Sequence, residues 1–370
     1  CGPNWTPAVQ QEAAKVGPHT SALSPENVEL IWDDIRYQER DGFIRIVTEA
    51  ELGKLAPPNL KISRVAVVPQ SNRRGRIILN LSAPVSLPSH RPQGKRRRVE
   101  TEHPSVNETT VPAADQSAAE ALGTAQNAIL RFMFEVDPTW EIDWQKVDLS
   151  DGFWRMIVEH GETFNFVFQL PPRPGDTTKY YVIPAALQMG WKNSPAYFCI
   201  ATEGARELNR RLLALTLKTG IDTPHRHEAL CLSPTAAPTM NPPEPQPWGE
   251  PISCTLFARC FVDDFMNGLA GDPSRPSRRQ QQLWFSRATM HAIHAVFPPS
   301  DVTGREGGKD SVSEKKLLKG DAQFKTAEEL LGFEFVRRTG RDRVVGMRDA
   351  KKLKYAAQIN QALRQPRGFI

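Results

Sequence analysis

The chain has 370 residues, 39% hydrophobic and 24% charged, which excludes a disordered or low-complexity polypeptide and allows a sizeable core. A net charge of +5 favours a polyanionic partner without excluding a neutral substrate. The sequence contains no apolar run of the ~18 residues that a membrane span requires, so no membrane association is expected. Five cysteines at irregular spacing exclude a disulfide framework and favour an intracellular location, in cytosol or nucleus. Because the first residue is Cys1 rather than methionine, we expect a piece of a longer protein, with other domains elsewhere in a polyprotein.

The N-terminal third is predicted to begin as an arm and to continue with a β-hairpin. Residues 1–30 are polar with few periodic apolar positions, which predicts a loosely packed arm. Apolar spacing over 31–55 predicts short helices. The β-rich runs 64–68 and 76–81 flank a turn-like Ser-Asn-Arg-Arg-Gly stretch, which predicts a hairpin.

A segment rich in proline, serine and charge follows at 84–112 and contains a Lys-Arg-Arg-Arg run at 95–98. Such a run is typical of a solvated loop. The alternative is a phosphate-contacting or nuclear-import patch.

Strand-like and helix-like runs alternate along the rest of the chain. Ser194 and Pro195 suit the N-cap and the first position of a long helix, and Gly220 is its expected stop. Residues 221–252 are proline-rich, which predicts a surface insertion. The other expected elements are helices at 113–134 and 283–297 and strands at 144–149, 163–170, 256–262, 265–269 and 330–336.

Two adjacent aspartates, Asp263 and Asp264, lie between two strand-like runs. Because neighbouring carboxylates repel and burying either is costly, the pair indicates either a solvent-exposed turn or a divalent cation site. Asp148 also ends an apolar strand and is followed by a turn and the aromatic Phe153. Three carboxylates on neighbouring strand ends can bridge two metal ions ~4 Å apart and clamp the oxygens of an in-line phosphoryl displacement. The three aspartates are therefore the candidate catalytic residues.

The order of these segments resembles that of reverse transcriptases of retroviruses and LTR-type retroelements over roughly residues 60–355. Each motif alone is weak, but the set in this order is specific. The motifs are Arg-Ile-Ile-Leu-Asn-Leu at 76–81, the aspartate, turn and aromatic at 148–153, Leu-Gln-Met-Gly followed by Ser-Pro within 187–198, Phe-Val-Asp-Asp at 261–264, and the primer-grip Leu-Gly-Phe at 331–333.

The resemblance implies an α+β fold, a right-hand palm-type polymerase with fingers, an antiparallel palm sheet backed by helices and a truncated thumb. It implies RNA-directed DNA polymerase activity, a two-metal-ion transfer of dNTPs to a primer 3′ end on an RNA or DNA template, with low processivity. The alternatives are an RNA-dependent RNA polymerase and a decayed palm-like domain that only binds nucleic acid. The implied domains are an arm at 1–30, fingers at 31–140 with the loop 84–112, a palm at 141–340 with the insertion 221–252, and the start of a thumb at 341–370.

The resemblance also implies roles for individual residues. Asp148, Asp263, Asp264 and the carbonyl of Leu149 would hold two Mg²⁺ ions, with Mn²⁺ as a substitute. Phe153 would exclude a 2′-hydroxyl, and an ordinary core aromatic is the alternative. The implied substrate-binding residues are completed by Arg76 on the triphosphate, Met189, Gly190 and Lys192, and the primer grip by Leu331, Gly332 and Phe333.

The sequence departs from the family pattern at several positions. Gln70 stands where lysine is frequent, so Arg73 or Arg74 is expected to replace that triphosphate-binding cation. Met189 occupies a common glutamine position and Phe261 the usual tyrosine position. None of these changes removes a metal ligand.

Two smaller groups of residues have more than one interpretation from the sequence. One lysine before the primer grip could protonate the leaving pyrophosphate, and the candidates are Lys315, Lys316 and Lys319. A zinc site would need ligands at standard spacing, which is not the spacing of His225, His227 and Cys231.

Overall fold

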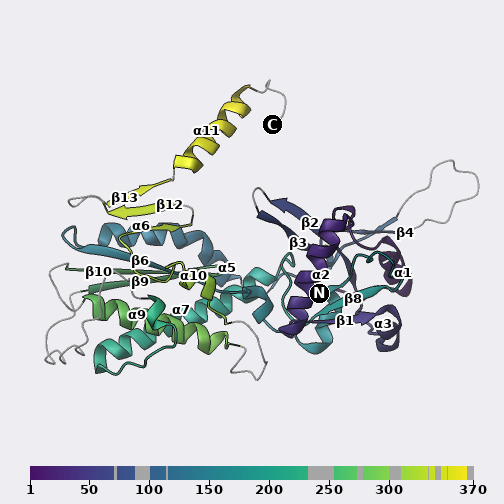
Figure 1. Cartoon of the computed structure of the whole chain (residues 1–370), viewed down its shortest axis with the longest axis horizontal. Coiled ribbons are helices and arrows are strands. Elements are labelled where there is room, and N and C mark those ends of the chain that lie inside the picture. Colours follow the sequence, from purple (N-terminus) through teal and green to yellow (C-terminus); the bar gives the residue numbers. More distant parts are fainter. Residues whose placement is uncertain are drawn as a thin grey trace, which may run out of the picture. The chain divides into compact units, whose positions relative to one another are not determined.

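The structure is a computed structural model, and it describes residues 1–70, 73–87, 101–113, 116–231, 254–272, 278–299, 310–331, 333–337, 343–347 and 349–364. The chain divides into two compact units (Figure 1). The first contains 1–117, 151–200 and 297–311, and the second contains 118–150, 201–296 and 312–370. The expected ranges 31–140 and 141–340 do not coincide with these units, because the chain passes from one unit to the other several times.

The first unit is built on a five-stranded mixed sheet in the order β1-β8-β7-β2-β3. Its strands are β1 (Ile44–Thr48), β2 (Ile62–Gln70), β3 (Arg73–Asn80), β7 (Val167–Gln169) and β8 (Tyr180–Pro184). The β2–β7 pair is parallel and the other pairs are antiparallel. The expected hairpin is confirmed as β2–β3.

The two faces of this sheet pack against different helices. Along β8, Tyr181 and Ile183 join the apolar cluster that includes α1 (Pro7–Val16), whereas Val182 joins the cluster that includes α2 (Pro25–Arg40). This division follows from the two-residue period of a strand. The sheet is therefore covered on both faces.

The expected loose arm at 1–30 is wrong. Trp5, Val9 and Ala13 are only 4%, 2% and 5% exposed, and they pack on the sheet. Val9 and Ala13 are four residues apart and therefore share one face of α1, although most of the segment is polar. Thr6 caps this helix by accepting a hydrogen bond from the amide of Val9.

Three other expected elements are only partly right. Residues 31–55 include the strand β1 between α2 and α3 (Glu49–Leu55). Residues 163–170 begin as the 3₁₀ helix η4 (His160–Phe166) and become extended only in β7. In place of one helix over 113–134, α5 (Ser117–Glu120), η2 (Ala121–Thr124) and α6 (Ala125–Glu135) follow one another. The remaining elements of the first unit are η1 (Thr20–Ala22), β4 (Val85–Leu87), β5 (Thr101–His103), α4 (Val106–Thr109) and η3 (Gly152–Arg155).

The second unit is built on an antiparallel sheet in the order β6-β10-β9. Its strands are β6 (Glu141–Asp148), β9 (Cys254–Phe261) and β10 (Asp264–Gly271), close to the expected ranges. Figure 1 draws α6 on one side of this sheet and α9 (Arg278–Val296) on the other. The helix predicted from Ser194 and Pro195 is confirmed as α7 (Ser194–Thr219), which belongs to this unit from residue 201 onward and is followed by Gly220 with φ +69°. The smaller helices are α8 (Glu228–Cys231), α10 (Glu314–Leu317) and α11 (Asp349–Arg364).

The two faces of the β6-β10-β9 sheet differ in chemistry. On the α6 face, Trp144 lies edge-on to Phe132 at 5.8 Å between ring centroids. On the α9 face, the buried side-chain amide of Asn267 donates to Gln145 at 2.8 Å and to Thr289 at 2.9 Å. An edge-on aromatic pair such as Trp144 and Phe132 contributes about 0.5–1.5 kcal/mol of stability beyond the burial of its surface. The polar network fixes the position of α9, because a buried amide left without partners would be costly.

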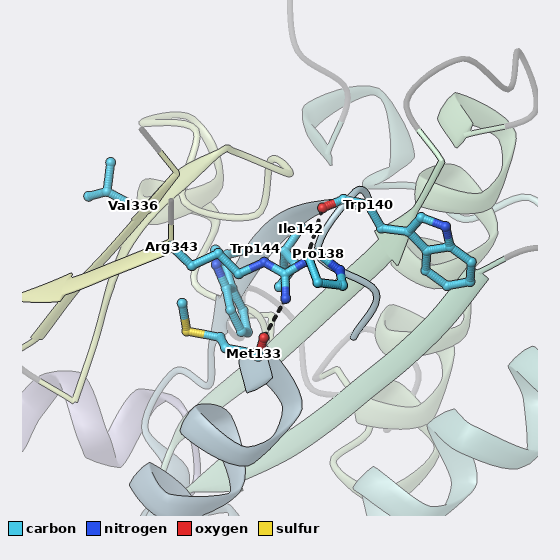
Figure 2. A pocket seen from close by; sticks show the side chains of 7 residues that line it. All are labelled: Met133, Pro138, Trp140, Ile142, Trp144, Val336 and Arg343. Atoms are coloured by element: carbon cyan, nitrogen blue, oxygen red, sulfur yellow. Dashed lines mark hydrogen bonds between the residues drawn. The ribbon is translucent and has the colours of Figure 1, made fainter. Parts of the chain in front are cut away.

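A second antiparallel sheet, β11 (Ala327–Leu330), β12 (Phe333–Arg337) and β13 (Arg343–Gly346), packs on the α6 side. Arg343 joins it to the end of α6, and Figure 2 shows its guanidinium directed at the carbonyls of Met133 and Trp140. It also donates to the carbonyls of Val136 and Asp137. One side chain therefore binds a carbonyl in the last turn of α6, that of its C-cap Val136 and two in the segment that follows.

Several expectations lie outside the described residues, namely the basic run 95–98, most of the insertion 221–252 and Gly332. Among the helices that the structure describes, none is both long enough and apolar enough to cross a membrane.

Candidate active site

The three predicted carboxylates come together at one end of the β6-β10-β9 sheet. Asp148 and Asp264 are directly opposed in the antiparallel register of β6 and β10. Opposed residues point to the same face, so the two side chains lie next to each other. Asp263 lies in the two-residue turn between β9 and β10, and its carbonyl accepts a hydrogen bond from the amide of Leu149 at 2.9 Å. The turn is thereby held against the end of β6.

The turn itself contains an unusual backbone conformation. Val262, immediately before Asp263, has a φ of +56°. A β-branched residue in the left-handed region costs on the order of 1–3 kcal/mol, and such strain clusters at functional sites. The sheet hydrogen bonds on both sides of the turn hold Val262 in this conformation.

Two lysines neutralise two of the carboxylates. Lys146 Nζ lies 2.9 Å from Asp264 Oδ2, and Lys316 Nζ contacts Asp148 Oδ1. Lys146 was not foreseen from the sequence, although it lies two residues before Asp148 and so on the same face of the strand. Of the three lysines considered as proton donors, Lys315 and Lys319 are exposed, and Lys316 is the one at the carboxylates.

Burial and the neighbouring carboxylates disfavour the ionised forms of Asp263 and Asp264. Burial raises the pKa of Asp264 to about 6, and hydrogen bonding to Asp148 and repulsion from Asp263 add to the effect, while Lys146 opposes it. Although Asp263 is exposed at the turn, partial desolvation of its carboxyl and then repulsion from Asp148 raise its pKa. Burial alone would lower the pKa of Lys146, but its hydrogen bond to Asp264 and the surrounding carboxylates raise it.

This donor set fits a hard divalent cation. Mg²⁺ prefers carboxylate and carbonyl oxygens, and a bound cation would offset both the burial cost and the repulsion that raise the two carboxyl pKa values. Asp148, Asp263 and the carbonyl of Leu149 could take this role, although Asp148 is also in contact with Lys316. Asp264 already has a cationic partner in Lys146.

The first unit brings together three of the residues expected to bind substrate. Arg76 on β3 donates to the sulfur of Met189, so the guanidinium is held beside the loop that also contains Gly190. Gly190 has a φ of +102°, and a Cβ there would lie 3.0 Å from the carbonyl oxygen of Leu79. Glycine is therefore required for close approach of this loop to β3.

Asn107 positions the same loop and was missed from the sequence. Its side-chain amide donates to the carbonyl of Gly190 at 2.8 Å, and its Oδ1 accepts from the amide of Lys192 at 3.0 Å. Lone asparagines in polar segments are common, so no sequence signal distinguished it. The side chain of Lys192 is exposed.

Phe153 lies in η3, half-buried, with its ring centroid 4.6 Å from that of Phe198 on α7. This contact fixes the orientation of the Phe153 ring. An ordinary core aromatic would make a contact of the same kind. Both roles considered for Phe153 are consistent with this placement. Arg74, a possible replacement cation, is in an exposed ion pair with Asp33 at 3.4 Å.

The described part of the primer-grip motif forms the β11–β12 turn. Leu331 has a φ of +52° in this turn, and Phe333 begins β12 opposite Leu330. The suggested zinc ligand Cys231 instead donates its thiol proton to the carbonyl of His227. Burial raises the pKa of Cys231 to about 12, so the thiolate that zinc needs is strongly disfavoured.

No protein-family model and no curated protein matches the sequence. Among solved structures, the chain is similar to a foamy viral protease-reverse transcriptase in complex with double-stranded DNA. The identity is 15% and the TM-score 0.42, with 92% of this chain and 38% of that chain covered. The chain thus spans less than two thirds of that protein, and a similarity at this level does not assign it to a family.

Proposed function

We propose that this protein is an RNA-directed DNA polymerase that adds deoxynucleotides to a primer 3′ end at Asp148, Asp263 and Asp264. The observation that carries the proposal is the direct opposition of Asp148 and Asp264, with Asp263 in the adjoining turn. The motif order in the sequence supports the same reaction. Asp148, Asp263 and Asp264 would hold two Mg²⁺ ions, which would supply charge stabilisation for the attacking hydroxyl and the departing pyrophosphate.

The chain's own residues have separate roles in this proposal. Lys316 donates a proton to the pyrophosphate, supported by its contact with Asp148. Lys146 balances the charge of Asp264, which reduces the share of Asp264 in metal binding. Arg76 binds the triphosphate as a fixed guanidinium. Phe153 excludes a 2′-hydroxyl, because a ring held by Phe198 leaves no room for another oxygen.

Primer extension on an RNA template with Mg²⁺ tests the proposal. Asp263→Asn should lower the rate by on the order of 10²-fold or more, because it removes one ligand charge while keeping the shape. Asp349→Asn is the matched control, since Asp349 is 91% exposed at the start of α11. Equal rates for wild type and Asp263→Asn would contradict the metal assignment.

The same variants separate metal binding from catalysis. A Mn²⁺ titration followed by electron paramagnetic resonance measures binding without any substrate. Asp263→Asn should weaken Mn²⁺ binding and Asp349→Asn should leave it unchanged. A chain that binds Mn²⁺ through Asp263 but extends no primer would instead favour a palm-like domain retained for binding nucleic acid.

A further inference from the structure

A groove of about 630 Å³ lies between α7 and β9 in the second unit, away from the carboxylates. On α7 its wall is one face of the helix, since the lining positions recur three or four residues apart. On β9 it is lined by four consecutive residues at the outer strand of the β6-β10-β9 sheet. The lining residues used below are Arg206, Arg210, Ala214, Leu217, Leu256 and Arg259.

Arg259 has a buried guanidinium nitrogen, Nε, that no described residue satisfies, and its nearby carboxylate, Glu203, is already paired with Arg206. Arg206 and Arg210 line the same groove but are already paired, with Glu203 at 2.6 Å and Glu207 at 2.7 Å. Burial lowers the pKa of Arg259 and repulsion from Arg206 adds to this effect, while Glu203 opposes it. An anion in the groove would satisfy the buried Nε and relieve this repulsion.

The apolar part of the groove lies directly beside this cation. Leu217, Leu256 and Ala258 are half-buried, and Ala214 is exposed. An anion with no apolar neighbours would leave these surfaces in contact with water. The groove is therefore complementary to a chain that has a carboxylate next to an apolar side chain.

We propose that this groove binds an extended acidic peptide segment of a partner protein, with a carboxylate on Arg259 and apolar side chains against Leu217 and Leu256. An outer strand has backbone amides and carbonyls outside its own sheet, which an extended peptide can pair with. Among the described lining residues, Arg259 is the arginine with a buried nitrogen left unsatisfied, and one such group matches a single carboxylate rather than a row of phosphates.

Nucleic acid fits the groove less well. Binding of single strands relies on aromatic rings that stack on bases. The rings in the lining are Phe257 and Phe285, which are only 8% and 1% exposed. Their faces are covered by the core, so the groove offers no stacking surface among its described residues.

Fluorescence anisotropy with the full 370-residue chain tests this proposal. The probe is a labelled octapeptide of alternating aspartate and leucine, and the matched probe has asparagine in place of aspartate. Wild type should bind the acidic probe at least about tenfold more tightly than the neutral one, as expected for a desolvated charge pair. Arg259→Met, which keeps the apolar stem, should remove this preference.

The control is Arg211→Met, on α7 but outside the groove lining, which should change binding less than about twofold. Ala214→Glu gives a second test at an exposed position, and should weaken the acidic probe even if Arg259→Met fails to fold. Equal binding of the two probes, or equal effects of the two arginine variants, would overturn the proposal. The proposal would also be overturned if Arg259→Met weakened binding of a labelled thymidine 20-mer and left binding of the acidic peptide unchanged.

Discussion

Lys146 Nζ lies 2.9 Å from Asp264 Oδ2, so the proposed metal centre contains a cation of its own. Both side chains are only about one fifth exposed, at 23% and 22%. The two residues are diagonal neighbours across the β6–β10 pair, where long side chains can meet. In the proposed reaction, Lys146 would compete with a metal ion for Asp264.

Replacing this cation should strengthen metal binding. In Lys146→Met, Mn²⁺ affinity should rise about fivefold, because the removed repulsion amounts to about 1 kcal/mol at an effective dielectric between protein and water. An electron paramagnetic resonance titration measures it, with Lys352→Met on exposed α11 as the control. Unchanged or weaker Mn²⁺ binding in Lys146→Met would contradict the competition.

The raised pKa of Asp264, about 6, predicts a pH-dependent stability without metal. A carboxyl whose pKa is higher in the folded state binds its proton more tightly when folded, so stability falls as pH rises from about 4 to about 6. Between pH 4 and pH 7, wild type should therefore lose on the order of 1–3 kcal/mol relative to Asp264→Asn. Urea unfolding at both pH values, followed by tryptophan fluorescence, checks this difference. A parallel pH dependence in the two proteins would count against it.

The backbone strain at Val262 is expected to lower folding stability and to support primer extension. Val262→Gly removes the cost of a left-handed φ and should raise folding stability by about 1 kcal/mol. It should also lower the rate of primer extension, because Asp263 is then less firmly held. Val262→Ala retains a Cβ and should not stabilise the fold. If alanine stabilises as much as glycine, the backbone strain is not the cause.

Phe153 should determine sugar selectivity. Phe153→Ala is expected to reduce the preference for deoxynucleotides over ribonucleotides at least about tenfold, since one blocked hydroxyl is worth on the order of 1–3 kcal/mol. The ratio of kcat/KM values for the two nucleotides measures the effect. Phe153→Tyr keeps the ring and should retain the preference. An unchanged ratio in Phe153→Ala would leave Phe153 as an ordinary core aromatic against Phe198.

Arg343 should hold the β11-β12-β13 sheet against α6. Arg343→Lys should increase hydrogen exchange of the β12 and β13 amides, corresponding to a loss of about 2–3 kcal/mol in the local stability of this sheet. The reason is that a lysine ammonium cannot reach all the carbonyls that the guanidinium contacts at once. Arg131→Lys on the exposed side of α6 is the control, with its ion pair to Glu135 79% and 60% exposed. Similar exchange in both variants would argue against the role.

The elements with strong local signals were predicted well. The strand that ends at Asp148 has its apolar residues at Ile142, Trp144 and Val147, and the strand that begins at Asp264 is mostly apolar. The α7 helix has its start and stop residues in the sequence. The N-terminal segment was mispredicted because two apolar residues, Val9 and Ala13, suffice to anchor one face of α1. The strand β7 was overextended, since apolar runs do not reveal where a 3₁₀ turn ends.

Residue type and strand position in the sequence predicted the candidate carboxylates Asp148, Asp263 and Asp264. Only the tertiary structure decided their register, which places Asp148 opposite Asp264, and their charge partners Lys146 and Lys316. It also decided the neighbours of Asn107 and Arg259, which come from distant parts of the chain. The physical reason is that local patterns predict strands and helices, while hydrogen bonds and ion pairs depend on which elements meet in the folded chain.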